Sequence, residues 1–111
     1  LGEFIAPLAI VTKEWSDLTQ EIARKAQANV EEVGAAAVDY LFYSGYVAVA
    51  YCWARSVAAL EGSAQSEAFK EAKRHTARFY FSRILPRIHS HGAAIRAGAD
   101  TLMAMPDSQF G

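Results

Sequence analysis

The chain has 111 residues, of which 52% are hydrophobic and 21% charged, so its composition indicates one globular domain and excludes a disordered chain. The formal net charge of −1 argues against a generic nucleic-acid-binding protein, and we predict no nucleic-acid partner. Because Cys52 is the single cysteine, an internal disulfide and a cysteine-rich metal site are excluded, and we expect a reducing, cytoplasmic location.

The first helical pattern runs from Pro7 to about Ala28. Proline suits the first turn of a helix, where its missing amide donor is not needed. Apolar side chains then recur at steps of three and four, at Leu8, Val11, Trp15, Leu18 and Ile22. The spacing predicts an amphipathic helix that packs through this face.

A second helix is predicted from about Val30 to Leu60, with Asn29 positioned to cap its first amides. Gly62 and Ser63 mark its end. A third helix is expected to start within 63–66 and to run as far as Pro86, which must break or kink it.

A further helical segment is predicted over Arg87–Ala97, and a last turn over Ala99–Ala104. No strand-like alternation of polarity appears in the sequence, and helix-favouring alanine is abundant. We therefore predict an all-α domain over residues 1–111: an up-down antiparallel bundle of three to four helices, with the third helix kinked at Pro86.

The segment Tyr40–Ala54 carries no charge, which raises the possibility of a membrane span. Its 15 residues would cover about 22 Å as a helix, whereas the hydrocarbon core of a bilayer is about 30 Å thick. We therefore predict a buried helix and no membrane span.

The second helix is apolar all round. On a helical wheel, Phe42, Val49 and Trp53 lie on nearly the opposite side from Tyr40, Val47 and Tyr51. Such a helix must be covered all round, either as the centre of a compact bundle or by something outside the chain. The aromatic and apolar residues predicted to form an interface are Tyr40, Tyr43, Val47 and Tyr51.

Seven basic residues and one acid lie within 68–96, whereas residues 1–67 hold an excess of acids. Arg83 and Arg87 fall near an apolar stripe of the third helix. Such arginines pair with carboxylates or helix-end carbonyls, lie at an interface, or bind an anion such as a cofactor phosphate. Arg83 and Arg87 are therefore the candidates for cofactor binding.

The sequence offers no catalytic constellation. His89 and His91 are two residues apart, which points them to different faces of a helix and makes them a poor metal pair. Cys52 lies in the most apolar helix, where a thiol is normally inert. No phosphate-binding loop, nucleophile elbow or metal motif occurs, so we predict neither catalytic residues nor a metal site in this chain.

Two long runs resemble the C-terminal helical domain of large acyl-CoA dehydrogenases (the acetyl-CoA dehydrogenase C-terminal-like family). They are VEEVGAAAVDYLFYSGYVAVAYCWAR, at Val30–Arg55, and EAKRHTARFYFSRILPRIHSHGAAIRAGADTLMAM, at Glu71–Met105. Each motif alone is an alanine-rich helix, but the order and spacing of the two make the resemblance more specific.

The resemblance implies an FAD-dependent flavoprotein of fatty acid metabolism, an oxidoreductase that oxidises the α–β bond of an acyl-CoA thioester. FAD, the catalytic glutamate and the acyl-CoA substrate would belong to upstream domains, and no cofactor is expected in this chain. The chain starts at Leu1 and would be a C-terminal fragment that docks on the upstream domains or on a second subunit of a dimer. Two alternatives are a free-standing homodimeric helical module without enzymatic activity and a peripheral membrane module.

Overall fold

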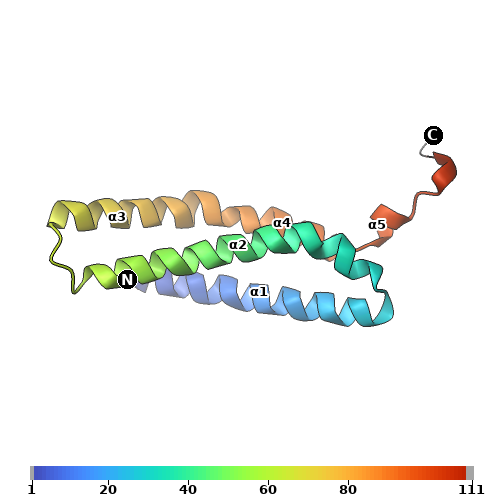
Figure 1. Cartoon of the computed structure of the whole chain (residues 1–111), viewed down its shortest axis with the longest axis horizontal. Helices are drawn as coiled ribbons and strands as arrows, with labels where there is room; N and C mark the ends of the chain where they lie inside the picture. The colour runs from blue at the N-terminus through green and yellow to red at the C-terminus, as the bar shows by residue number, and fades with distance from the viewer. Residues whose placement is uncertain (1, 110–111) are drawn as a thin grey trace.

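The computed structural model describes residues 2–109, and all regular structure within them is helical (Figure 1). The α-helices are α1 (Gly2–Ala28), α2 (Glu31–Leu60), α3 (Glu67–Phe79), α4 (Ile88–Ala97) and the single turn α5 (Asp100–Met103). A π-helical segment, Tyr80–Ile84, and a 3-10 segment, Leu85–Arg87, join α3 to α4, and a 3-10 turn covers Asp107–Gln109. The all-α prediction is confirmed.

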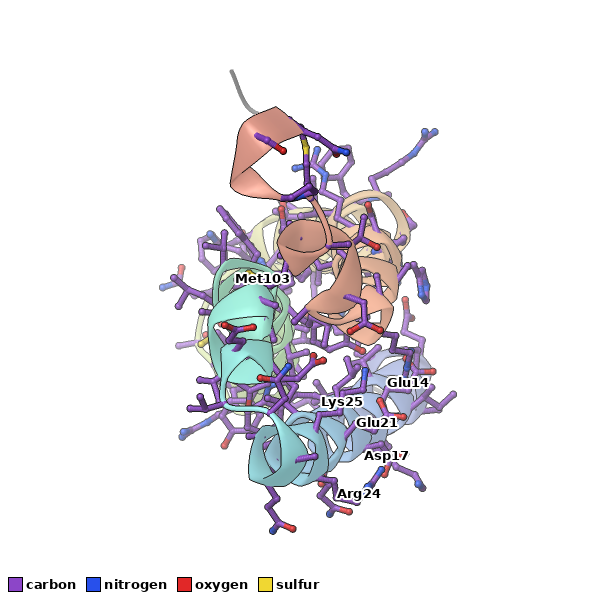
Figure 2. All side chains as sticks on the ribbon, turned by 90° about the vertical axis from the view of Figure 1, so that its right-hand side faces the viewer. Glu14, Asp17, Glu21, Arg24, Lys25 and Met103 are labelled. Carbon is purple, nitrogen blue, oxygen red and sulfur yellow. The ribbon has the colours of Figure 1, made fainter. Side chains whose placement is uncertain are left out.

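Helix α2 lies between two antiparallel neighbours, with α1 along one side and the α3–α4 rod along the other (Figure 1). Figure 2 looks along the bundle, so that the helices are seen end on. The labelled Asp17 and Arg24 of α1 point outward, whereas Glu21 and Lys25 reach toward Arg96 of α4. The Cα atoms span 64 × 30 × 16 Å, so the molecule is long and thin.

Helix α1 begins five residues before Pro7, which therefore lies inside the helix rather than in its first turn. The cause is tertiary packing upstream of the proline. The Phe4 side chain is buried, and its ring centroid lies 5.1 Å from that of Phe81. Burial of this aromatic ring favours helix over 2–6 and offsets the hydrogen bond that Pro7 cannot make.

Helix α2 begins one residue after the predicted start. The side chain of Asn29 accepts a hydrogen bond from the Glu31 amide at 3.1 Å, so it satisfies one free donor at the helix start, as the sequence predicted. Glu32 joins the start of α2 to the segment after α4, because its carboxylate accepts a hydrogen bond from the Ala99 amide at 3.1 Å. The preceding Gly98 ends α4 with φ of 74°, a conformation that other residues rarely adopt.

The third helix starts within the predicted window, since Ser66 caps α3 and accepts the Phe69 amide at 3.1 Å. Its α-helical bonding ends at Phe79, seven residues before Pro86. The Leu85 amide bonds instead to the carbonyl of Tyr80, five residues earlier, which widens the turn just before the proline. The predicted kink of the axis at Pro86 stays a prediction.

The core is a narrow seam where α2 meets its two neighbours. Leu18 of α1 and Ile88 of α4 are fully buried against the inner side of α2. The Tyr80 hydroxyl donates to the Tyr46 carbonyl at 2.6 Å, which fastens the π segment to α2. The seam runs the length of the bundle but covers only one side of each helix.

The accessible surface of the chain is 7283 Å², against about 6,000 Å² for a typical monomer of 12.1 kDa. The Cα radius of gyration is 18.5 Å, whereas a compact chain of this length has about 13 Å. Of the two arrangements that the sequence left open, cover by the chain's own helices is therefore achieved on one side of α2 only.

Removal of a core side chain tests the seam. We expect Leu18→Ala to lower the free energy of unfolding by about 3 kcal/mol, because the leucine is fully buried and its loss leaves a cavity. Leu102→Ala is the matched control, since Leu102 is exposed and its loss should change stability by no more than about 0.5 kcal/mol. Urea denaturation followed by circular dichroism measures both, and equal losses would contradict this description of the core.

The two buried tyrosines predict an alkaline loss of stability. Burial raises the pKa of Tyr43 and of Tyr80 to about 12, and the Glu14 carboxylate adds to the effect at Tyr43. Unfolded tyrosine ionises near 10, so the fold is at full stability below pH 10 and loses stability as the pH rises toward 12.

The measurement is the midpoint of urea unfolding at a series of pH values from 8 to 12. This range includes the interval between the unfolded and folded pKa values of the two tyrosines, in which the loss of stability is expected. The Tyr43→Phe/Tyr80→Phe variant should show a flatter decline, because phenylalanine has no proton to lose. A decline as steep as that of the unmodified chain would assign it to other groups.

Candidate docking surface

The side of α2 that faces away from the core is apolar and exposed. We call it the outer face of α2, and its residues are Gly34, Val38, Leu41, Phe42, Gly45, Ala48, Val49 and Cys52. Leu41 is 71% exposed and Val38 is 65% exposed, although both are large aliphatic side chains. No charged residue belongs to this face between Glu31 and Arg55. Exposed apolar surface of this continuity marks an interaction site.

A groove between α1 and α2 borders the outer face. Its wider part has a volume of about 660 Å³ and is lined by side chains of both helices, among them Ile22, Ala26, Val33, Ala37 and Leu41. A second hollow of about 390 Å³ continues along the same two helices, and both hollows include Ser44. The Trp15 indole donates to the Ser44 hydroxyl at 2.8 Å, and the Thr19 and Tyr40 hydroxyls are hydrogen-bonded at 2.7 Å, which holds the two walls together.

The four predicted interface residues divide between the core and the surface. Tyr43 and Val47 are buried in the seam, so they are not available to a partner. Tyr40 is half-buried and stacks on Trp15, with ring centroids 6.4 Å apart. Tyr51 is exposed and lies beneath the Arg55 guanidinium, 5.9 Å from the ring centroid. Tyr51 and the rim of Tyr40 are therefore the predicted interface residues that reach the surface, and their contact with a partner stays a prediction.

Cys52 lies on the exposed side of α2. The sequence places this thiol in the most apolar helix, a setting in which a thiol is normally inert. The side chain is nevertheless exposed, because the apolar character of α2 extends to its uncovered side. The thiol is therefore open to solvent and to reagents.

Arg83 and Arg87, the predicted phosphate contacts, have exposed side chains in the segment that joins α3 to α4. Neither lines the groove between α1 and α2. Within the described residues, neither side chain takes part in an ion pair. Contact of these arginines with a phosphate stays a prediction.

Other bases of the 68–96 region are neutralised inside the chain. Arg78 donates to Glu3 at 2.6 Å and to Glu71 at 3.1 Å, which ties α3 to the start of α1. These hydrogen bonds hold the pKa of both carboxyl groups below the usual range. Arg74 also pairs with Glu71, and Arg96 pairs with Glu21 across to α1. Arg74, Arg78 and Arg96 are therefore paired with carboxylates of the chain itself.

A histidine–aspartate pair joins α2 and α4, and the sequence analysis missed it. His91 Nδ1 lies 2.9 Å from Asp39 Oδ1, and the imidazole stacks on the rings of Phe42 and Tyr46 at centroid distances of 5.2 and 5.8 Å. The two residues are 52 positions apart, so no local spacing signals the contact. The pair and its aromatic neighbours form a polar clamp between two helices.

Among residues 2–109, no group of three or more His, Cys, Asp or Glu side chains could hold a metal ion. Helix α2 is long and apolar enough to cross a membrane by length and composition, and 22% of its most apolar window is buried in the fold. The core helices of many soluble proteins pass the same test, so it carries little weight.

The acetyl-CoA dehydrogenase C-terminal-like family model matches residues 1–106 of the chain. No curated protein and no solved structure matches the chain. The family match spans all the long helices and the seam that joins them. The chain therefore belongs to the acetyl-CoA dehydrogenase C-terminal-like family.

Proposed function

We propose that the chain is a structural and docking domain of an FAD-dependent acyl-CoA dehydrogenase, a cytoplasmic oxidoreductase that oxidises the α–β bond of an acyl-CoA thioester in fatty acid metabolism. The proposal rests on the family match over residues 1–106. The domain packs on the main body of the enzyme or on a second subunit. The observation that supports docking is the outer face of α2, which is apolar, exposed and free of charge over more than five helical turns.

We place FAD and the acyl-CoA site in other domains of that enzyme. A flavin dinucleotide carries a diphosphate, which proteins bind with basic side chains or with the free amides of a helix start. The groove between α1 and α2 is lined by apolar, alanine, serine, threonine and tyrosine residues and by no charged one. It therefore does not fit the cofactor, and the chain's part in the reaction is to hold the assembly together.

The parent enzyme gives the first test of this function. We expect the purified natural protein to carry flavin absorbance that an acyl-CoA bleaches, because flavin reduction accompanies oxidation of the thioester. Removal of residues 1–111 should lower the melting temperature by about 5 °C or more, since a docked apolar face would become exposed. A natural protein without flavin, or a truncated form as stable as the intact enzyme, would contradict the proposal.

A separate test addresses the predicted phosphate contact. If Arg87 reaches the phosphates of acyl-CoA in the assembled enzyme, Arg87→Ala should raise KM for the acyl-CoA by about tenfold, because a charge-assisted hydrogen bond is lost. Arg24→Ala on α1 is the control, since Arg24 is exposed and carries the same charge. An unchanged KM in Arg87→Ala would remove Arg87 from the site and leave the docking role intact.

A further inference from the structure

Two copies of the outer face of α2 are complementary when they run antiparallel, both in the sizes of their side chains and in the charges at their ends. It is flanked by the acidic residue Glu31 at one end and the basic residue Arg55 at the other, both exposed. An antiparallel pair with its two-fold axis midway between Leu41 and Gly45 places Glu31 of each copy opposite Arg55 of the other. Opposite charges at both ends of one helix face favour this direction and disfavour the parallel one.

The same register places large side chains opposite small ones at each layer between the two ends. Leu41 falls opposite Gly45 of the second copy, and Val38 opposite Ala48. Gly34 falls opposite Cys52. Residues 34, 38, 41, 45, 48 and 52 alternate steps of four and three, which is the spacing of a helix seam that pairs with another helix.

The described residues leave space for a side chain at the two glycines of this seam. A Cβ atom added at Gly34 or at Gly45 would meet no atom within 4 Å. Glycine within a helix nevertheless costs about 1 kcal/mol relative to alanine. Close approach of another helix is a physical reason to have glycine at these positions, because it leaves room for the opposing side chain.

We propose that the outer face of α2 binds a second copy of this chain, α2 against α2, antiparallel and in the register described above. The inference rests on the docking role proposed for the domain and names its partner. The accessible surface supports it, because the excess over a typical monomer, about 1,300 Å², is larger than the area of about 800 Å² that one partner buries in a standard interface.

A lipid surface fits the face less well than a second copy does. Helices that lie on membranes present bulky apolar side chains with Lys or Arg on the polar side. The centre line of this face carries Gly34, Gly45 and Ala48, which offer little apolar area to lipid. Leu102 and Met103 of α5 border the face beside Gly34 and would extend the apolar contact to the end of the opposing helix.

A cysteine cross-link tests direction and register together. In the proposed dimer the two Cys52 residues lie about 27 Å apart along the helices, so the unmodified chain should give no disulfide-linked dimer under mild oxidation. Gly34→Cys should give a dimer linked to Cys52 of the other copy, which peptide mapping by mass spectrometry would identify. The helix has room for the new side chain, so folding should be unaffected.

The control is Ser56→Cys, which also adds an exposed thiol to α2 but lies about 33 Å from the opposing Cys52 in this register. It should give no cross-link to Cys52. A Cys52–Cys52 link in the unmodified chain, or a cross-link in Ser56→Cys equal to that in Gly34→Cys, would overturn the antiparallel register.

A second variant tests the fit at the centre of the interface. Gly45→Leu places a large side chain opposite Leu41, so we expect dimer affinity measured by sedimentation to fall more than tenfold. The helical signal should remain, because the chain has space at this position. Gln27→Leu on α1 introduces the same side chain at an exposed site away from the outer face of α2 and should leave the affinity unchanged.

The outcomes separate this inference from the proposed function. A monomeric mass at micromolar concentration would overturn the dimer. If that monomer also cosedimented with vesicles of phosphatidylcholine and phosphatidylglycerol, the outer face of α2 would be assigned to lipid instead. Neither result bears on the flavin and acyl-CoA readouts of the parent enzyme. Loss of those readouts with a Gly34→Cys cross-link intact would overturn the enzyme assignment and leave the dimer standing.

Discussion

The constraint on which the rest of the structure depends is the number of helices available to cover α2. This helix is apolar on all sides, but residues 2–109 supply it with only two long neighbours, α1 and the α3–α4 rod. Two rods cover about half of the circumference of a third. The seam, the groove between α1 and α2 and the exposed outer face all follow from this geometry. The incomplete cover is also the basis of the docking role proposed for the domain.

Helix positions were predictable from local chemistry, because most ends carry a cap or a breaker. Asn29 forms the capping contact that the sequence predicted, and Ser66, within the predicted window, caps α3. Gly98 ends α4 directly after the predicted segment Arg87–Ala97. The start of α1 was not predictable in this way, since it depends on burial of Phe4 against Phe81, far along the chain. The π segment before Pro86 likewise reflects the bond from Tyr80 to α2 as much as the proline.

The sequence predicted that the candidate docking surface lies on α2, but not which side of α2 it occupies. A helical wheel gives the angles between residues, yet it does not say which angle meets α1 and which meets α4. Tyr43 and Val47 were therefore assigned to an interface although they form the core, and Leu41 and Val38 were overlooked. The His91–Asp39 contact was missed for the related reason that it joins two helices. Both depend on long-range packing, which the periodicity of one helix does not contain.

The long, thin shape has a consequence for how the chain moves in solution. A radius of gyration of 18.5 Å is that of a compact protein of about 270 residues. A single copy should therefore diffuse and elute like a globule of more than twice its mass, and an antiparallel pair would gain width while its length grows little. Elution volume is consequently a poor guide to copy number for this chain, whereas the ratio of friction to mass falls when two thin rods become one thicker one.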